Sequence, residues 1–145
     1  MVRVMHHLVN PQEVIEVFSK LLKKKGFLIL EFANKIHGKA LLENICKGDF
    51  TFPVDISPTD RRCVENQQNE IISFYNYHPD TILQALKEHH LKVIEMRSVS
   101  NIRSRRMKKV IPLSVLMGLE ALFQKRLASI YFGPSIFILA QKQEP

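Results

Sequence analysis

The sequence predicts an α/β fold, in which a mixed sheet of about four strands is flanked by helices. Two observations carry this prediction. Apolar runs of strand length alternate with amphipathic helical segments along the 145 residues, and such alternation is typical of layered α/β sheets. The segment from 10 to 34 also holds one complete unit, a capped helix followed by a glycine and an apolar strand. We expect a single domain over 1–145, which is long enough for a core.

The N-terminal segment supplies a short strand and a helix start. Val2–Met5 is apolar enough for a short buried strand. Asn10 suits the N-cap position, Pro11 suits the first helical position, and Glu13 can complete a capping box. We therefore expect the first long helix to begin here. Its apolar stripe follows the spacing i, i+1, i+4, i+7, i+8 and consists of Val14, Ile15, Phe18, Leu21 and Leu22.

The end of this helix and the next strand follow at once. Lys23–Lys25 fall in the expected last turn, where cations oppose the negative end of the helix dipole. Gly26 fits the C′ position. Phe27–Phe32 is a nearly continuous apolar run, which predicts a strand covered on both faces.

The middle of the chain is less regular. Lys35–Gly48 predicts a helix, and Asp49–Gln68 predicts a long irregular excursion with little secondary structure. Ile71–Tyr77 mixes aromatic and polar residues. His78–His90 predicts a second long helix with Pro79 at its start.

The C-terminal part predicts two strands separated by a helix. Leu91–Val99 alternates as a strand towards a sheet edge, and Asn101–Lys109 reads as a basic loop. Pro112–Leu127 predicts a strongly apolar helix. A tight Gly133-Pro134 turn then allows the last strand, Ser135–Gln141, to run antiparallel. The last four residues form a polar tail.

Composition narrows the class of protein. The formal net charge is +7 and the pI is about 9.6. This excess indicates either a solvated basic surface or a partner that is anionic. Arg103, Arg105 and Arg106 belong to a basic cluster that either meets a phosphate-bearing substrate or nucleic acid, or is simply solvated. Cys46 and Cys63 show no metal spacing, and so we expect free thiols. No apolar run spans a bilayer and no secretory pattern precedes the first helix, so we expect a soluble, cytoplasmic protein.

Four segments together resemble the C-terminal half of class I S-adenosylmethionine-dependent methyltransferases, which have a Rossmann-like fold. They are VMHHL, then a helix that runs into LLKKKGFLILEF, then HPDTILQALKEHHLKVIE, and finally GPSIFILAQK. In that family a histidine-rich turn follows the fourth strand, and the seventh strand is antiparallel and lies between the fifth and sixth. The resemblance covers nearly the whole chain outside 49–68. Lysines stand where the family usually has proline and a first glycine, and Leu91 stands where it has Gly-Phe.

The family's cofactor grip has no counterpart in this sequence. The grip is a glycine-rich loop after the first strand, with an acidic residue after the second. The chain has only five glycines and no GxG. The resemblance therefore implies S-adenosylmethionine as cofactor, with a binding site that is incomplete in this chain. We expect a fragment, a truncated gene product, or a protein whose missing half another chain supplies.

The resemblance also implies site residues. His6 and His7 follow the strand tip that faces the methionine end of the cofactor, where a histidine can orient substrate or act as a general base. The alternative is that they are turn histidines that cap a carbonyl or pack on the sheet edge. Nothing in the sequence chooses between His6 and His7 for the functional role. The candidates for substrate binding also have a structural alternative each. Asn34 is either a substrate contact or a loop-forming residue, and Tyr75 and Tyr77 are either part of a lid or packed under a loop. The sequence identifies neither a catalytic residue nor a metal ligand.

Two functions of different classes follow. The first is methyl transfer from S-adenosylmethionine to a small-molecule acceptor. The second is a non-catalytic, methyltransferase-like remnant or partner-binding module. Without the missing half, the sheet edge at Val2–Met5 is exposed, which predicts pairing with that half or self-association. We do not expect nucleic acid as a partner.

Overall fold

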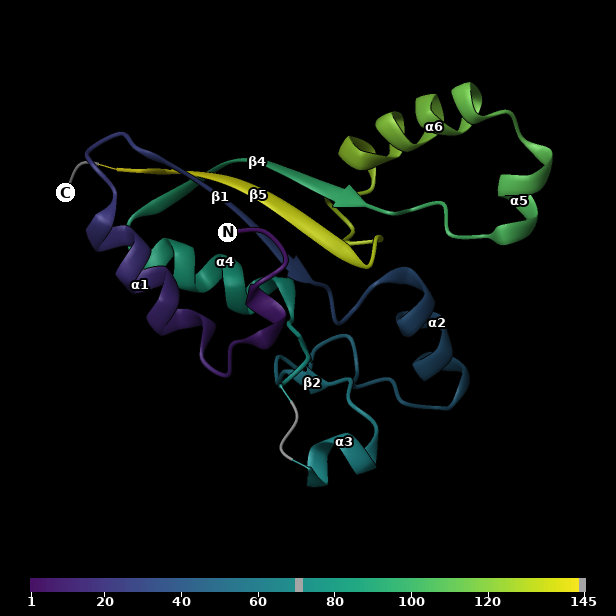
Figure 1. Ribbon diagram of the computed structural model, residues 1–145, viewed down its shortest axis with the longest axis horizontal. Helices are drawn as coiled ribbons and strands as arrows, with labels where there is room; N and C mark the ends of the chain where they lie inside the picture. The colour runs from purple at the N-terminus through teal and green to yellow at the C-terminus, as the bar shows by residue number, and fades with distance from the viewer. Residues whose placement is uncertain (70–71, 144–145) are drawn as a thin grey trace.

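The computed structural model describes residues 1–69 and 72–143. Figure 1 shows a three-stranded sheet with helices below it and a two-helix arm that projects from one end. The start of the predicted Ile71–Tyr77 segment and the last two residues of the predicted polar tail lie outside the described residues. No helix among the described residues is long and apolar enough to span a bilayer.

The sheet has its closing strand in the centre. β5 (Ser135–Lys142) lies between β1 (Phe27–Ala33) and β4 (Leu91–Val99), and it pairs antiparallel with both. β1 and β5 align without interruption from Phe27 opposite Gln141 to Ala33 opposite Ser135. The predicted antiparallel direction of the last strand and the predicted edge position of β4 are therefore confirmed.

The predicted strand at Val2–Met5 is wrong. Arg3 has a left-handed backbone with a φ of 57°, which turns the chain away from the sheet, and η1 (Met5–His7) is a 3-10 helix. At this end of the chain, Met1 alone forms backbone bonds to β1. Its amino group donates to the Ile29 carbonyl, and its own carbonyl accepts from the Glu31 amide. These two bonds are those of a parallel bridge. The main sheet of the described residues therefore has three strands, and Met1 lies along the edge of β1 opposite β5.

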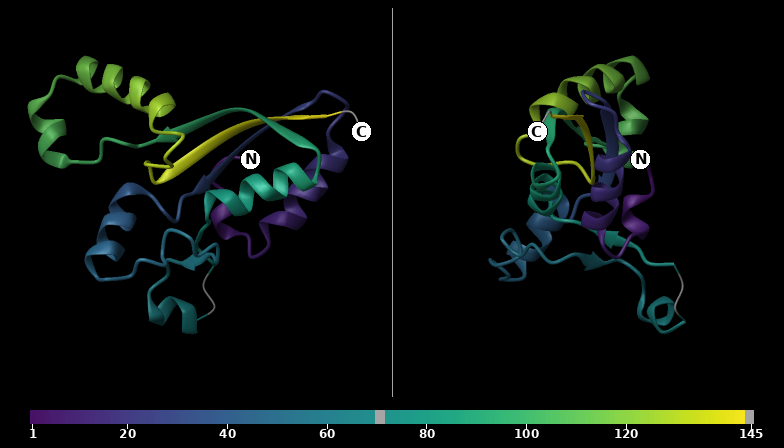
Figure 2. Two further views of the ribbon diagram at one scale, coloured as in Figure 1. Left: turned by 180° about the vertical axis from the view of Figure 1, so that it is seen from behind. Right: turned by 90° about the vertical axis from the view of Figure 1, so that its left-hand side faces the viewer.

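One face of the sheet is covered by two helices. α1 (Pro11–Leu21) and α4 (Pro79–Glu88) pack against each other and against this face (Figure 2). The predicted cap is present, since Asn10 Oδ1 accepts from the Gln12 amide at 3.2 Å. Each fully buried aliphatic side chain here stabilises the fold by about 1.5–3 kcal/mol. The core consists of Met5, Ile15, Leu28, Leu30, Phe32, Tyr77, Ile82, Ala85, Leu86, Leu91, Ile136, Ile138 and Ala140.

The opposite face of β1 is open, which corrects the expectation of a strand covered on both faces. Phe27 and Ile29 are 59% and 54% exposed, whereas Leu28, Leu30 and Phe32 between and after them are buried. The alternation arises because both covering helices of this chain lie on one side. The apolar side chains of Phe27 and Ile29 are therefore in contact with solvent.

The end of α1 also differs from the prediction. The helix ends at Leu21, so Lys23–Lys25 follow the last turn instead of lying in it. Lys25 takes the left-handed position, with a φ of 60°, and Gly26 does not. Gly26 allows a close approach instead, because a Cβ there would lie 2.8 Å from the Lys23 carbonyl oxygen.

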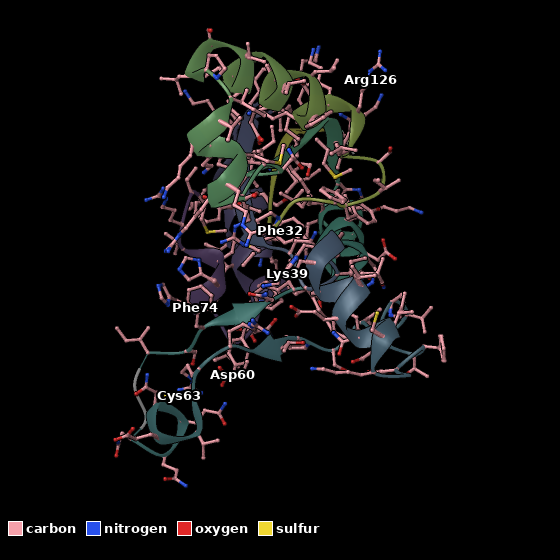
Figure 3. All side chains as sticks on the ribbon, turned by 90° about the vertical axis from the view of Figure 1, so that its right-hand side faces the viewer. Phe32, Lys39, Asp60, Cys63, Phe74 and Arg126 are labelled. Carbon is pink, nitrogen blue, oxygen red and sulfur yellow. The ribbon has the colours of Figure 1, made fainter. Side chains whose placement is uncertain are left out.

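The segment after β1 forms the predicted helix and then a loose excursion. α2 (Gly38–Cys46) is followed by β2 (Thr59–Asp60), α3 (Val64–Gln68) and β3 (Tyr75–Asn76), and β2 and β3 form a two-stranded ribbon. Figure 3 shows that the part with Asp60 and Cys63 hangs away from the sheet. Cys46 and Cys63 are free, as predicted, and both are exposed.

The arm, residues 100–132, joins β4 to β5. The basic stretch predicted to be a loop contains α5 (Arg105–Val110), because the Ser104 hydroxyl accepts from the Met107 amide and caps a helix there. α6 (Leu113–Arg126) is the predicted apolar helix, but none of its residues is buried. It lies on the side of the sheet away from α1 and α4 and contacts β4 (Figure 2).

Candidate functional site

Most candidate residues meet where β1 ends, beside η1 and β3. Tyr77 pairs with this end of β1, because its amide donates to the Ala33 carbonyl and its carbonyl accepts from the Lys35 amide. This forms a parallel bridge to Asn34 on the edge of β1 that Met1 also uses. The structure thus brings Asn34 and Tyr77 side by side and places η1 next to both strands.

Tyr77 fixes the position of η1. Its side chain is 1% exposed, and its hydroxyl donates to the Leu8 carbonyl just after η1. Burial, together with the neighbouring Tyr75, raises the pKa of Tyr77 to about 12. The phenol therefore stays protonated and holds the turn. The ring of Tyr75 lies 6.3 Å from that of Tyr77 and is half-buried. The substrate contacts predicted for both tyrosines stay predictions.

His6 and His7 stand together against an aromatic ring. Their ring centroids are 4.0 Å apart, and that of Phe74 lies 4.6 Å from His6. His7 Nδ1 lies 2.7 Å from the Ser73 carbonyl oxygen, which makes it the donor. Burial, reinforced by His7 and opposed by Glu31, lowers the pKa of His6 below 6.5. A half-buried imidazole in this state is neutral near pH 7 and can accept a proton.

Asn34 is fully buried and its amide is engaged with backbone. Nδ2 donates to the Tyr131 and Gly133 carbonyls at 2.5 and 2.8 Å, and Oδ1 accepts from the Ile36 amide at 3.1 Å. These bonds tie the end of β1 to the turn before β5. The geometry gives Asn34 a structural role, and the substrate contact predicted for it stays a prediction.

Sequence reasoning missed Lys35, the residue after Asn34. Its side chain is 2% exposed, and Nζ donates to the Asp55 carboxylate at 2.6 Å and to the Asp55 and Ser57 carbonyls at 2.7 and 2.8 Å. This ammonium holds the pKa of Asp55 well below its usual range. The Phe52 ring lies 5.4 Å from Nζ. Lys35 therefore anchors the excursion at the end of β1, and no spacing in the sequence indicates a partner twenty residues away.

Comparisons with known proteins identify the fold. No family model matches the chain, and no curated protein matches it in sequence. A solved structure from Listeria monocytogenes, provisionally assigned as an S-adenosylmethionine-dependent methyltransferase, matches 99% of this chain with a TM-score of 0.56 at 14% identity. An S-adenosylmethionine-dependent methyltransferase from Mesorhizobium loti matches 97% with a TM-score of 0.52 at 8% identity. The chain therefore has the fold of class I S-adenosylmethionine-dependent methyltransferases. It spans 60% and 59% of those two chains.

The residues described do not by themselves fit S-adenosylmethionine. A cofactor grip of this kind needs glycines with open space in front of the backbone. A Cβ on Gly38 would lie 2.6 Å from the Phe132 ring, and one on Gly133 would lie 2.5 Å from the Ser98 hydroxyl, so the chain itself fills both spaces. Gly118 lies within a helix, and Gly48 follows one.

Proposed function

We propose that this chain serves S-adenosylmethionine-dependent methyl transfer to a small-molecule acceptor, and that it forms the acceptor side of the site. One observation carries the proposal. The fold agreement with two methyltransferases extends over nearly the whole chain, including the antiparallel strand between β1 and β4. At 14% and 8% identity this agreement concerns the fold, so the activity is our inference.

His6 is the residue that we propose to assist the acceptor. A hydroxyl or amine loses a proton when it is methylated, and a neutral imidazole within hydrogen-bond reach takes that proton. Contact with Phe74 and the Tyr77 hydroxyl bond to Leu8 hold the imidazole in place. Positioning supplies much of the catalysis in a reaction of this kind. His7 donates to Ser73, and in this proposal both histidines face the methionine end of the cofactor.

We further propose that a polypeptide segment outside this chain covers the open side of β1 and supplies the glycine-rich loop that binds the cofactor. Two features support this: the exposed Phe27 and Ile29 side chains, and the edge at which Met1 forms a parallel bridge. The free thiols of Cys46 and Cys63 support a cytoplasmic location, where disulfides are rare.

Calorimetric titration of the chain with S-adenosylmethionine tests whether cofactor binding needs polypeptide outside this chain. We expect no binding in the micromolar range, because the chain has no GxG and its two glycines with open space in front of them, Gly48 and Gly118, lie after and within a helix. Micromolar affinity for the chain alone would show that the grip lies within it. His6→Gln provides the second arm. In a complex that does transfer methyl groups, this variant should lower kcat and leave the affinity for S-adenosylmethionine within about threefold.

A second candidate function is a non-catalytic module that binds a protein partner. The apolar face with Phe27 and Ile29 favours it, since exposed apolar patches of this kind mark interaction surfaces. Light scattering distinguishes a monomer from a self-associated form of the chain. Self-association that Ile29→Lys abolishes would support docking through this face. A monomer that does not self-associate, at any concentration up to millimolar, would argue against it.

A further inference from the structure

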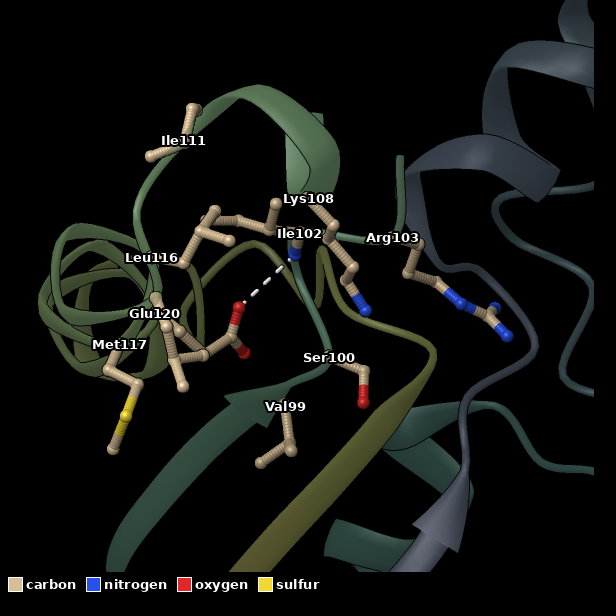
Figure 4. A pocket seen from close by; sticks show the side chains of 10 residues that line it. Val99, Ser100, Ile102, Arg103, Lys108, Ile111, Leu116, Met117 and Glu120 are labelled. Carbon is tan, nitrogen blue, oxygen red and sulfur yellow. Dashed lines mark hydrogen bonds between the residues drawn. The ribbon is translucent and has the colours of Figure 1, made fainter. Parts of the chain in front are cut away.

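Two cavities outside the histidine site share one residue. The arm cavity has a volume of about 520 Å³ and opens between the end of β4, α5 and α6. Figure 4 shows its aliphatic walls and Arg103 at its rim, with the guanidinium directed away towards α2. Arg103 also lines the basic pocket, a second cavity of about 280 Å³. The apolar walls of the arm cavity come from Val99, Ile102, Ile111, Leu113, Leu116 and Met117.

Hydrogen bonds fix the two sides of the arm cavity relative to each other. Glu120 accepts from the Ile102 amide at 3.1 Å and from the Asn101 amide at 3.0 Å, which ties α6 to the end of β4. The single carboxylate of this cavity is therefore occupied by backbone donors. Leu113 and Met117 remain 73% and 64% exposed. An apolar occupant would cover these side chains.

The basic pocket carries an excess of positive charge. It is lined by five lysines and arginines and one carboxylate, that of Glu43. Lys35 is paired with Asp55, and Lys39 lies 3.5 Å from Glu43. Arg61, Arg103 and Lys47 line the pocket with no acidic partner within residues 1–69 and 72–143. The pocket is therefore cationic.

The positive charge of the pocket affects the pKa of its histidine, His37. Burial lowers the pKa of His37, and Arg103 and Arg61 lower it further. His37 Nδ1 accepts from the Ala40 amide at 3.3 Å, which makes it the cap of α2. The imidazole is thus neutral and fixed, and the positive charges of the pocket are those of arginine and lysine.

We propose that the two cavities together bind one amphipathic anion, with a carboxylate or phosphate in the basic pocket and an apolar body in the arm cavity. Arg103 stands at the boundary, and a guanidinium is suited to bidentate contact with such oxygens. The aliphatic walls supply the second half of the recognition. That this anion is the methyl acceptor rests on the function proposed above, whereas its binding does not.

Calorimetry on the chain without cofactor tests the binding. The probes are decanoate, hexanoate, decanol and decyl phosphate, each below its micelle-forming concentration. Affinity should rise about fourfold for each methylene that is buried between hexanoate and decanoate. Decanol should bind at least about tenfold more weakly than decanoate, because it lacks the charge that Arg103 and Arg61 meet. Decyl phosphate and decanoate distinguish the two anionic groups.

Two exposed arginines provide a matched pair of variants. Arg103→Gln should weaken decanoate about tenfold and leave decanol unchanged. Arg105→Gln, on α5 but in neither lining, should change neither. Both side chains are exposed, so far-ultraviolet circular dichroism should be the same for both variants.

Three results would overturn the proposal. The first is equal affinity for decanol and decanoate. The second is an equal loss in Arg103→Gln and Arg105→Gln, which would indicate a diffuse charge effect. The third is binding to phosphatidylserine vesicles without binding of the monomeric carboxylates, which would assign the arm to a membrane surface. If decanoate binds as expected but no methyl transfer is found in any complex, the proposed function fails and this site stands.

Discussion

Replacing Asn34 with alanine is expected to destabilise the fold by about 3 kcal/mol. The side chain is fully buried and makes three hydrogen bonds to backbone, two through Nδ2 and one through Oδ1. Each contributes about 1 kcal/mol net, and more where the partner is left buried without a replacement. The loss reaches the turn that starts β5, which is the central strand.

Urea unfolding followed by circular dichroism at 222 nm measures this loss. With a slope of about 2 kcal/mol/M for a domain of this size, the midpoint should fall by about 1.5 M. Asn44→Ala is the control, because Asn44 is half-buried and makes one bond, from Nδ2 to the Ala40 carbonyl within α2. Its midpoint should move by less than about 0.3 M, since alanine is the better helix former.

The aspartate variant sharpens the test. Asn34→Asp keeps an oxygen for the Ile36 amide but directs the other at the Tyr131 and Gly133 carbonyls. It should therefore be less stable than Asn34→Ala near neutral pH. Equal, small shifts for Asn34→Ala and Asn44→Ala would refute the structural role and leave the Asn34 amide available for substrate.

Three further predictions concern the site and its frame. Burial lowers the pKa of His6 below 6.5, so the unfolded chain takes up its proton first as the pH falls. The stability that His6 contributes above about pH 6.5 is therefore lost as the pH falls through its folded pKa, and His6→Gln should reduce the difference between urea midpoints at pH 7.5 and 5.5. Tyr77→Phe removes the buried hydroxyl that anchors η1 and should cost about 1 kcal/mol in thermal unfolding; an unchanged melting temperature would contradict this. Gly133→Ala should cost about 2 kcal/mol because its Cβ would lie 2.5 Å from the Ser98 hydroxyl, whereas Gly118→Ala, with open space within 4 Å, should stabilise α6 by up to about 1 kcal/mol.

Local signals predicted most of the elements. The cap at Asn10 and the proline at Pro79 marked the starts of α1 and α4 because they act through bonds within one or two residues. The antiparallel last strand followed from a helix and a tight turn. Two failures were local as well, where a residue's own backbone or cap overrode the pattern of its neighbours. The chain turns at Arg3 in place of extending Val2–Met5, and Ser104 caps a helix where the run of charge suggested a loop.

The candidate site was predicted in part. Sequence order placed the histidines, Asn34 and the tyrosines near one end of the sheet, and the structure brings Asn34 beside Tyr77 and the histidines beside Phe74. The sequence did not indicate the role of Lys35, because its partners lie twenty and more residues away. Nor did it indicate that Arg103 lines two cavities, which depends on how the arm folds back towards α2.

The sequence by itself determined the positions of α1, β1, α4 and β5 and the absence of a glycine-rich loop, because capping, periodicity and glycine spacing are properties of neighbouring residues. Tertiary structure decided which apolar faces stay open. Phe27 and Ile29 make the other face of β1 apolar over its first half, yet only the face towards α1 and α4 is buried. It also decided that Asn34 bonds to backbone and that five cations surround one pocket, since both depend on segments that meet only when the sheet has formed.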